Sequence, residues 1–230
     1  MWDDRLTDYS PAKIAERAQH VRSLLDKVRA MKTDNWPKDA RIDWILFRAQ
    51  LESVDFGDRI LKFEQTNPQT YTGECTSAIF SLLKKEYDTP RKRAVAATAR
   101  LKQMPALLKQ GLSNLQRPVK LYAQLAIQSA RSIDPLLNKS LMALDVDLSP
   151  EEHNDLIKAR DAALAALHSY ADELEKGSTA NGRFLADGRR QLQLLSQTCF
   201  ASAAQWRRGG DDWTRRARAL SRPRGSSSRS

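Results

Sequence analysis

The sequence predicts an all-α protein: a multi-helix array of six to seven helices, with long kinked helices and a disordered basic C-terminal tail. From Ser10 to Lys176, apolar residues recur at spacings of three and four, as they do along one face of a helix. No stretch alternates apolar and polar residues over more than a few positions, so we expect no sheet. Proline, glycine and capping residues then mark where the helices begin and end.

Caps and prolines bound the helices of the first half. Ser10-Pro11 predicts a helix over residues 11–31, because serine favours the N-cap position and proline fits the first turn. A longer helix is expected over residues 38–66, and it stops before Pro68 because proline disfavours helical backbone in its predecessor. Gly57 weakens the middle of this helix by roughly 1 kcal/mol.

Two shorter helices follow. One carries the apolar stripe that runs from Ile79 to Tyr87, and Thr89-Pro90 caps the next. We expect Met104-Pro105 to interrupt the pattern, because proline removes a backbone donor, and a short helix to follow over residues 105–115.

Two long helices complete the domain. The first is predicted over residues 118–144, with a kink at Pro135. The second is predicted over residues 150–176, with Gly177 just beyond its end. The segment Ser149-Pro150-Glu151-Glu152 is a capping box, so the start of this last helix is well defined.

Charge divides the chain into two parts. The 230 residues carry a formal net charge of +10, from 38 Lys and Arg against 28 Asp and Glu. Residues 1–182 hold 27 Lys and Arg against 25 acids, whereas residues 183–230 hold 11 Arg, 3 Asp and neither Lys nor Glu. We therefore predict a nearly neutral helical domain over 1–182 and an Arg-rich, poorly ordered tail over 183–230.

The sequence lacks the features that define several classes of protein. No apolar run approaches eighteen residues, and residues 1–5 lack a basic or apolar leader, so the chain as given is expected neither to span a membrane nor to carry a signal peptide. It also lacks the glycine-rich phosphate loop, the Gly-x-Ser-x-Gly hydrolase motif and the His-Glu-x-x-His zinc motif.

Residues that bind metals or act as nucleophiles are scarce. The histidines are His20, His153 and His168, and Ala165 stands where a ferritin-type Glu-x-x-His motif needs glutamate. Cys75 and Cys199 lie far apart, without Cys-x-x-Cys spacing. We expect His153 and His168 near the surface and Cys75 as a buried apolar residue. No catalytic residue and no metal ligand is therefore predicted in this chain, and no binding residue is assigned.

Two segments allow alternative interpretations. Residues 41–48 mix charge into an apolar run, which fits a ligand groove or partly buried ion pairs between helices, and we favour the ion pairs.

The tail combines arginines with tryptophans, a pattern that can bind single-stranded nucleic acid. Its complete lack of Lys and Glu argues against selection for such binding. The cluster consists of Arg207, Arg208, Arg215, Arg216 and Arg218 with Trp206 and Trp213.

Five stretches carry a resemblance to a known family, in the family's order. They are DDRLTDYSP (3–11), RIDWILFRAQLES (41–53), NPQTYTGECTSAIFSLLKKEY (67–87), RKRAVAATARLKQMPALLKQGLSNLQRPVKLYAQLAIQSARS (91–132) and ANGRF (180–184). On these stretches the chain resembles the bacterial domain-of-unknown-function 885 family, whose members are predicted zinc metallopeptidases built almost entirely of helices. No stretch is itself a catalytic signature.

The family is similar to carboxypeptidase-type zincins, in which His-Glu and Pro-Gly-His-His segments near the C-terminus hold the metal. No stretch of this chain matches those segments. The resemblance therefore implies the N-terminal helical half of such a protein, whose partner is the missing C-terminal half of its own fold. Zinc and a peptide substrate are implied only for full-length relatives, which often begin with an export or lipoprotein segment.

The tail suggests a frameshift. With codons chosen freely and read one nucleotide later, residues 188–213 can spell a sequence that resembles the family's continuation, and Trp206 then forces glycine. We infer a frameshift between about Phe184 and Gly188, which also explains the loss of Lys and Glu.

Three functions are compatible with these observations. The leading interpretation is the N-terminal helical half of a zinc metallopeptidase, without the metal-binding motif and inactive alone. The alternatives are a free-standing helical interaction module and a basic-tailed nucleic-acid binder.

Overall fold

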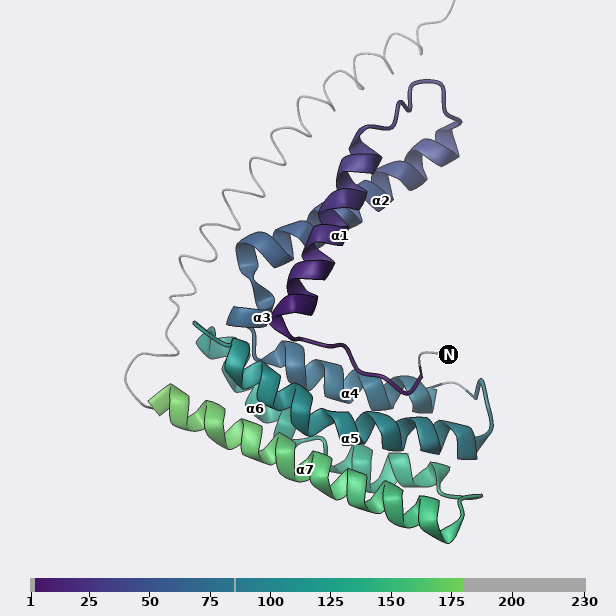
Figure 1. Cartoon of the computed structure of the whole chain (residues 1–230), viewed down its shortest axis with the longest axis vertical. Coiled ribbons are helices and arrows are strands. Elements are labelled where there is room, and N and C mark those ends of the chain that lie inside the picture. Colours follow the sequence, from purple (N-terminus) through teal and green to yellow (C-terminus); the bar gives the residue numbers. More distant parts are fainter. Residues whose placement is uncertain (1–2, 85, 180–230) are drawn as a thin grey trace, which may run out of the picture. The chain divides into compact units, whose positions relative to one another are not determined.

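The computed structural model describes residues 3–84 and 86–179, and this part of the chain contains helices and connecting segments but no strand. The predicted all-α array is therefore confirmed (Figure 1). The predicted tail over 183–230 lies outside the described residues. The α-helices are α1 (Pro11–Arg29), α2 (Lys38–Phe56), α3 (Phe63–Thr66), α4 (Gln69–Lys84), α5 (Pro90–Asn114), α6 (Lys120–Arg131) and α7 (Pro150–Thr179).

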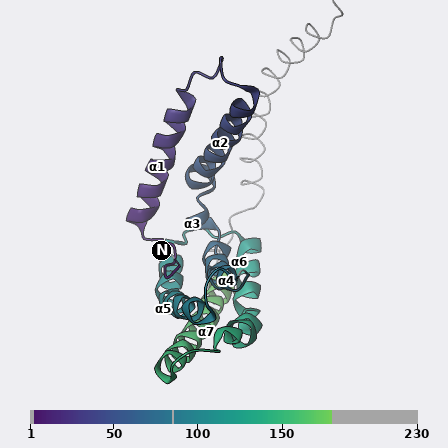
Figure 2. The same ribbon diagram turned by 90° about the vertical axis from the view of Figure 1, so that its right-hand side faces the viewer.

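Helices α1 and α2 form an antiparallel hairpin with its own small core (Figures 1 and 2). Leu25 and Val28 of α1 are buried against Leu51 of α2. The indole Nε1 of Trp44 donates a hydrogen bond of 2.9 Å to the carbonyl oxygen of Val28, which ties the two helices together near the turn.

The larger core lies among α4, α5, α6 and α7. Helix α5 packs against both α4 and α7, and α6 packs against α4 and α7. Tyr71, Leu101, Leu137 and Leu167 are fully buried there. The phenol of Tyr170 is also buried, and it donates to the carbonyl oxygen of Pro68, so the middle of α7 is bonded to the start of α4.

The predicted continuous helix over 38–66 is wrong. Helix α2 ends at Phe56, a π-helical turn covers Gly57–Leu61, and Lys62 adopts a left-handed conformation with φ of 49° before the short α3 begins. Low helix propensity at Gly57 makes this a favourable place for the helix to break. The chain therefore turns from the hairpin into the bundle at this point.

The predicted interruption at Met104-Pro105 is also wrong, because α5 runs without a break through Pro105. Leu101, Met104, Leu107 and Leu108 are buried on both sides of the proline. Their packing outweighs the cost of about 3 kcal/mol for proline within a helix.

Pro135 has a stronger effect than the predicted kink. Helix α6 ends at Arg131, and the chain continues as a π-helical turn (Leu136–Ser140) and a 3-10 turn (Leu141–Leu144). Proline cannot donate the bond that would continue α6, so the region predicted as one helix over 118–144 is divided.

The helix ends follow the sequence closely, with two corrections. Thr89 caps α5 as predicted, because its hydroxyl accepts a bond of 3.4 Å from the backbone N–H of Lys92. Ser10 occupies the N-cap position of α1, but its side chain makes no capping bond. Gly177 does not end α7, which continues to Thr179. Within the described residues, no helix has the length and apolarity that crossing a membrane requires.

Candidate functional site

A cleft of about 240 Å³ lies between α5 and the start of α7. Helix α5 contributes one face, and α7 contributes two carboxylates one turn apart, because residues at spacings of three, four and seven share a helix face. The lining residues are Val95, Thr98, Ala99, Lys102, Leu148, Glu152 and Asp155.

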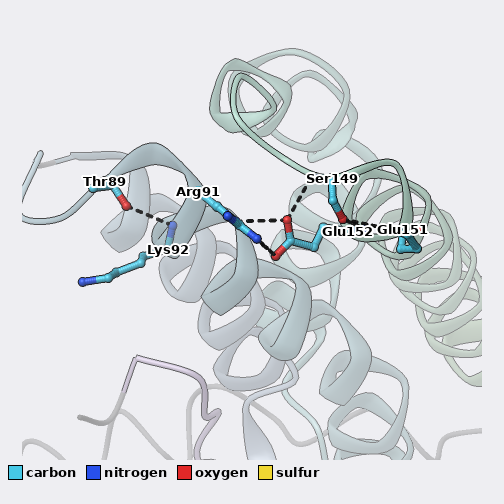
Figure 3. Close-up of polar contacts among 6 residues, drawn as sticks. All are labelled: Thr89, Arg91, Lys92, Ser149, Glu151 and Glu152. Carbon is cyan, nitrogen blue, oxygen red and sulfur yellow. Dashed lines mark hydrogen bonds and ion pairs between the residues drawn. The ribbon is translucent and has the colours of Figure 1, made fainter.

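Glu152 is held in place by the capping box and by an arginine of the neighbouring helix (Figure 3). Its carboxylate accepts a bond of 2.9 Å from the backbone N–H of Ser149, while its own N–H donates to the Ser149 hydroxyl at 3.2 Å. The guanidinium of Arg91 donates to both Glu152 oxygens at 3.0 to 3.2 Å. The predicted capping box is therefore confirmed, and Arg91 fastens it to α5.

These bonds also set the charge of Glu152. The backbone N–H of Ser149, followed by the Arg91 guanidinium, lowers the pKa of the Glu152 carboxyl. Glu152 is therefore anionic at neutral pH, and it is poorly suited to donate a proton.

The second carboxylate of the cleft is also paired with a cation of α5. Lys102 of α5 donates to Asp155 of α7 at 2.6 Å. The Thr98 hydroxyl donates to the carbonyl oxygen of Ala94 in its own helix. Among the described residues, no histidine or cysteine lines this cleft. The arrangement joins two helices through ion pairs and provides no nucleophile with a base beside it.

The capping box makes a testable contribution to stability. We expect Ser149→Ala to lower the free energy of unfolding by about 1 kcal/mol, because the Glu152 N–H loses its partner at the start of α7. Urea unfolding monitored by circular dichroism measures the change. Ser113→Ala is the matched control, since this exposed hydroxyl bonds only within α5. Equal effects of the two substitutions would contradict the role of the cap.

A second hollow of about 400 Å³ borders the first at Val95 and Ala99. It is lined by carboxylates and cations together, including the ion pair of Lys92 with Asp88 at 3.2 Å. Its mixed charge does not favour either an anionic or a cationic ligand.

The residues considered for chemistry have separate surroundings in the structure. His153 lies in the first turn of α7, with Nδ1 2.6 Å from Oδ2 of Asp145. His168 lies farther along α7, with Nε2 3.4 Å from Oδ1 of Asp134. Both side chains are nearly half exposed, as expected. Cys75 is fully buried in α4, also as expected, and burial raises the pKa of its thiol to about 12, which makes it a poor nucleophile.

Among the charged residues of the segment 41–48, Arg48 makes its contacts within α2. The guanidinium of Arg48 lies over the ring of Trp44, 4.6 Å from its centroid, and Nε of Arg48 is 3.8 Å from Oε1 of Glu52. Arg29 of α1 reaches the same Glu52 oxygen at 3.0 Å. The predicted ion pair between helices is therefore wrong for Arg48, which pairs within α2, and the pair that joins the two helices is Arg29–Glu52.

Sequence reasoning missed the side chains that hold the N-terminal segment. The amide of Gln103 accepts from the backbone N–H of Leu6 at 3.1 Å and donates to the carbonyl oxygen of Asp4 at 2.7 Å. Gln110 and Asn114, on the same face of α5, bond the N–H and the carbonyl oxygen of Tyr9. The 103, 110, 114 spacing of amides along one helix face was the available signal. They hold residues 3–10 as an extended strap across α5.

The fold and the cleft define an all-α domain with no assembled metal centre, because no three His, Cys, Asp or Glu side chains of the described residues gather to hold an ion. A family model described as "Bacterial protein of unknown function (DUF885)" matches residues 1–206. The chain therefore belongs to the DUF885 family. The match ends within the predicted tail, and the predicted boundary between residues 182 and 183 stays a prediction.

A solved structure supports the same fold. It is described as a putative lipoprotein of unknown function from Shewanella oneidensis, and it matches with a TM-score of 0.65 and 19% sequence identity. The match covers 79% of this chain and 34% of that chain, so this chain spans about a third of the Shewanella protein. No curated protein matches this chain.

Proposed function

We propose that this chain is the N-terminal helical part of a zinc-dependent, carboxypeptidase-like peptidase, inactive alone. In the intact enzyme its helices form one wall of the substrate cleft, and the metal is held by residues outside this chain. The main support for the proposal is the length of the match: it covers 79% of this chain but only 34% of the solved Shewanella protein. The resemblance of residues 3–184 to a family of predicted zinc peptidases supplies the reaction class.

The described residues do not fit a catalytic zinc site of their own. Such a site has three protein ligands and an open fourth position. Each candidate histidine has a single carboxylate beside it, and His153 and His168 are separated by four turns of α7. We therefore assign no catalytic step to any side chain of this chain.

Zinc content tests the proposal. We expect the purified 230-residue chain to retain less than about one-tenth of a zinc ion per chain after dialysis, because it lacks a set of three ligands. A full-length family member should retain about one zinc ion and hydrolyse peptides. Elemental analysis and a peptide-cleavage assay measure both. Stoichiometric zinc in this chain, or a full-length relative without zinc, would overturn the assignment.

An interaction module is the second candidate, because α2 exposes large apolar side chains to solvent. The downstream DNA separates the two: an intact peptidase gene continues, in another frame, into His-Glu and Pro-Gly-His-His segments. The arginine cluster behind the nucleic-acid alternative lies outside the described residues, and its binding would weaken steeply with salt.

A further inference from the structure

The two helices of the α1–α2 hairpin differ in the chemistry of their outer sides. The outer side of α1 exposes polar and charged residues, such as Ser23, Asp26 and Lys27. The outer side of α2 exposes large apolar residues instead. The exposed fractions are 44% for Ile42, 62% for Leu46, 50% for Phe47 and 37% for Val54.

These four residues belong to one continuous face. At 100° per residue, nine exposed positions of α2 fall within about 160° of the helix circumference. We call them the outer face of α2: Asp39, Ile42, Asp43, Leu46, Phe47, Ala49, Gln50, Ser53 and Val54. Asp39 and Asp43 are the charged residues among them. Another side of α2 packs on α1 through Leu51. A helix that is apolar on two sides is typical of a helix buried between other elements.

We propose that the outer face of α2 is the surface on which the rest of the family domain packs, and that the contacting surface is apolar and largely uncharged. This inference rests on the proposed function, because it takes this chain to be part of a larger fold. In the Shewanella relative about two-thirds of the chain lies outside the matched region, and that portion needs a surface to pack on. A face with two charges in nine positions, and with its four large apolar side chains exposed, fits such a permanent contact.

A second copy of this chain is a weaker match to the outer face of α2. Even a wholly buried aromatic side chain covers only about 150–250 Å². The four partly exposed apolar side chains therefore supply well under the about 800 Å² per partner that a specific interface between separate chains requires, so a second copy would need further contacts beyond them.

Cysteine labelling tests the proposal. Two variants of the 230-residue chain, Leu46→Cys and the control Ser23→Cys, are made in a Cys199→Ser background. Cysteines are also placed at the two structurally equivalent positions of the full-length Shewanella protein, after its own reactive cysteines have been removed. In this chain a maleimide should label both sites rapidly. In the full-length relative, the site equivalent to Leu46 should label at least about tenfold more slowly, while the control changes less than about twofold.

Other results would overturn the proposal. Fast labelling at the Leu46-equivalent site of the relative means that no part of its own chain covers this face. Protection from labelling that arises only when a peptide is added would show that the face binds substrate. Slow, concentration-dependent labelling in this chain, with a dimer on sedimentation, makes a second copy the occupant. Zinc content is measured separately. If the Leu46-equivalent site is protected in a full-length relative that holds no zinc, the proposed packing surface stands and the peptidase assignment fails.

Discussion

Replacing Gly111 by alanine should lower the free energy of unfolding by about 1–3 kcal/mol, although alanine is the better helix former. A Cβ atom at this position of α5 would lie 2.7 Å from Cγ of Tyr71 and 2.9 Å from two further ring carbons. The ring cannot easily retreat, because Tyr71 is fully buried and its hydroxyl donates to the carbonyl oxygen of Glu64 at 2.7 Å. Asn114 donates to the same hydroxyl at 3.2 Å. Urea unfolding of the full chain measures the loss.

Gly73 supplies the matched control. It lies inside α4, and a Cβ atom there meets none of the described residues within 4 Å. Gly73→Ala should therefore raise the free energy of unfolding by about 0.5–1 kcal/mol, from helix propensity alone. The same substitution should therefore change the free energy of unfolding in opposite directions at Gly111 and Gly73. A gain in stability for Gly111→Ala would show that α4 and α5 can move apart at this contact.

Much of the fold could be predicted because its signals are local. Ser149 and Glu152 define the start of α7 within four residues of sequence, and Thr89 does the same for α5. Periodicity predicted helices such as α5 because they bury one stripe in a core. The failures arose where distant contacts decide. Nothing near Pro105 shows that buried leucines on both sides keep α5 intact.

The outer face of α2 shows a different limit. In the sequence, an apolar stripe at helical spacing passes through Ile42, Ile45 and Ala49 and resembles a core face. Ile42 and Ala49 are nevertheless exposed in this chain. Periodicity indicates that a face is apolar, but it cannot tell whether the covering surface belongs to the same sequence. The strap was missed for a related reason, because Gln103 and Asn114 look like ordinary surface amides until residues 4–9 lie beside them.

No catalytic residue was predicted because the sequence contains no catalytic motif. Within the described residues, the structure adds that no three His, Cys, Asp or Glu side chains gather to hold a metal ion. A sequence motif cannot supply that information, because side chains far apart in sequence can meet in a folded chain. The ion pairs between α5 and α7 illustrate this, since Arg91 meets Glu152 across 61 residues of sequence.

Raising the pH above 9 should destabilise the protein by several kcal/mol before its lysines titrate. Burial raises the pKa of the Cys75 thiol from 9.0 to about 12 and that of the Tyr9 phenol from 10.0 to about 12. Burial also raises the pKa of Tyr71 and of Tyr170. The folded state therefore favours the neutral forms. Their stabilisation is fully present below the unfolded pKa values and is lost as the pH rises toward the folded ones.

Cys75 dominates the first part of this loss, because its thiol ionises in the unfolded chain about one pH unit before the phenols. Each pH unit between the unfolded and folded pKa values corresponds to about 1.4 kcal/mol, so the thiol alone accounts for up to about 4 kcal/mol by pH 12. The measurement is the urea midpoint of the Cys199→Ser chain between pH 7.5 and 10.5, in the presence of a reductant.

Cys75→Ala separates the thiol from the phenols. This variant should begin with a lower midpoint, because it leaves a small cavity in the core around α4, but its midpoint should stay nearly flat from pH 8.5 to 9.5. The decline should then begin nearer pH 10, where the phenols of Tyr9, Tyr71 and Tyr170 ionise on unfolding. An unchanged slope below pH 9.5 in Cys75→Ala would show that the buried thiol does not couple to folding, and that water reaches it in a core that the structure shows closed.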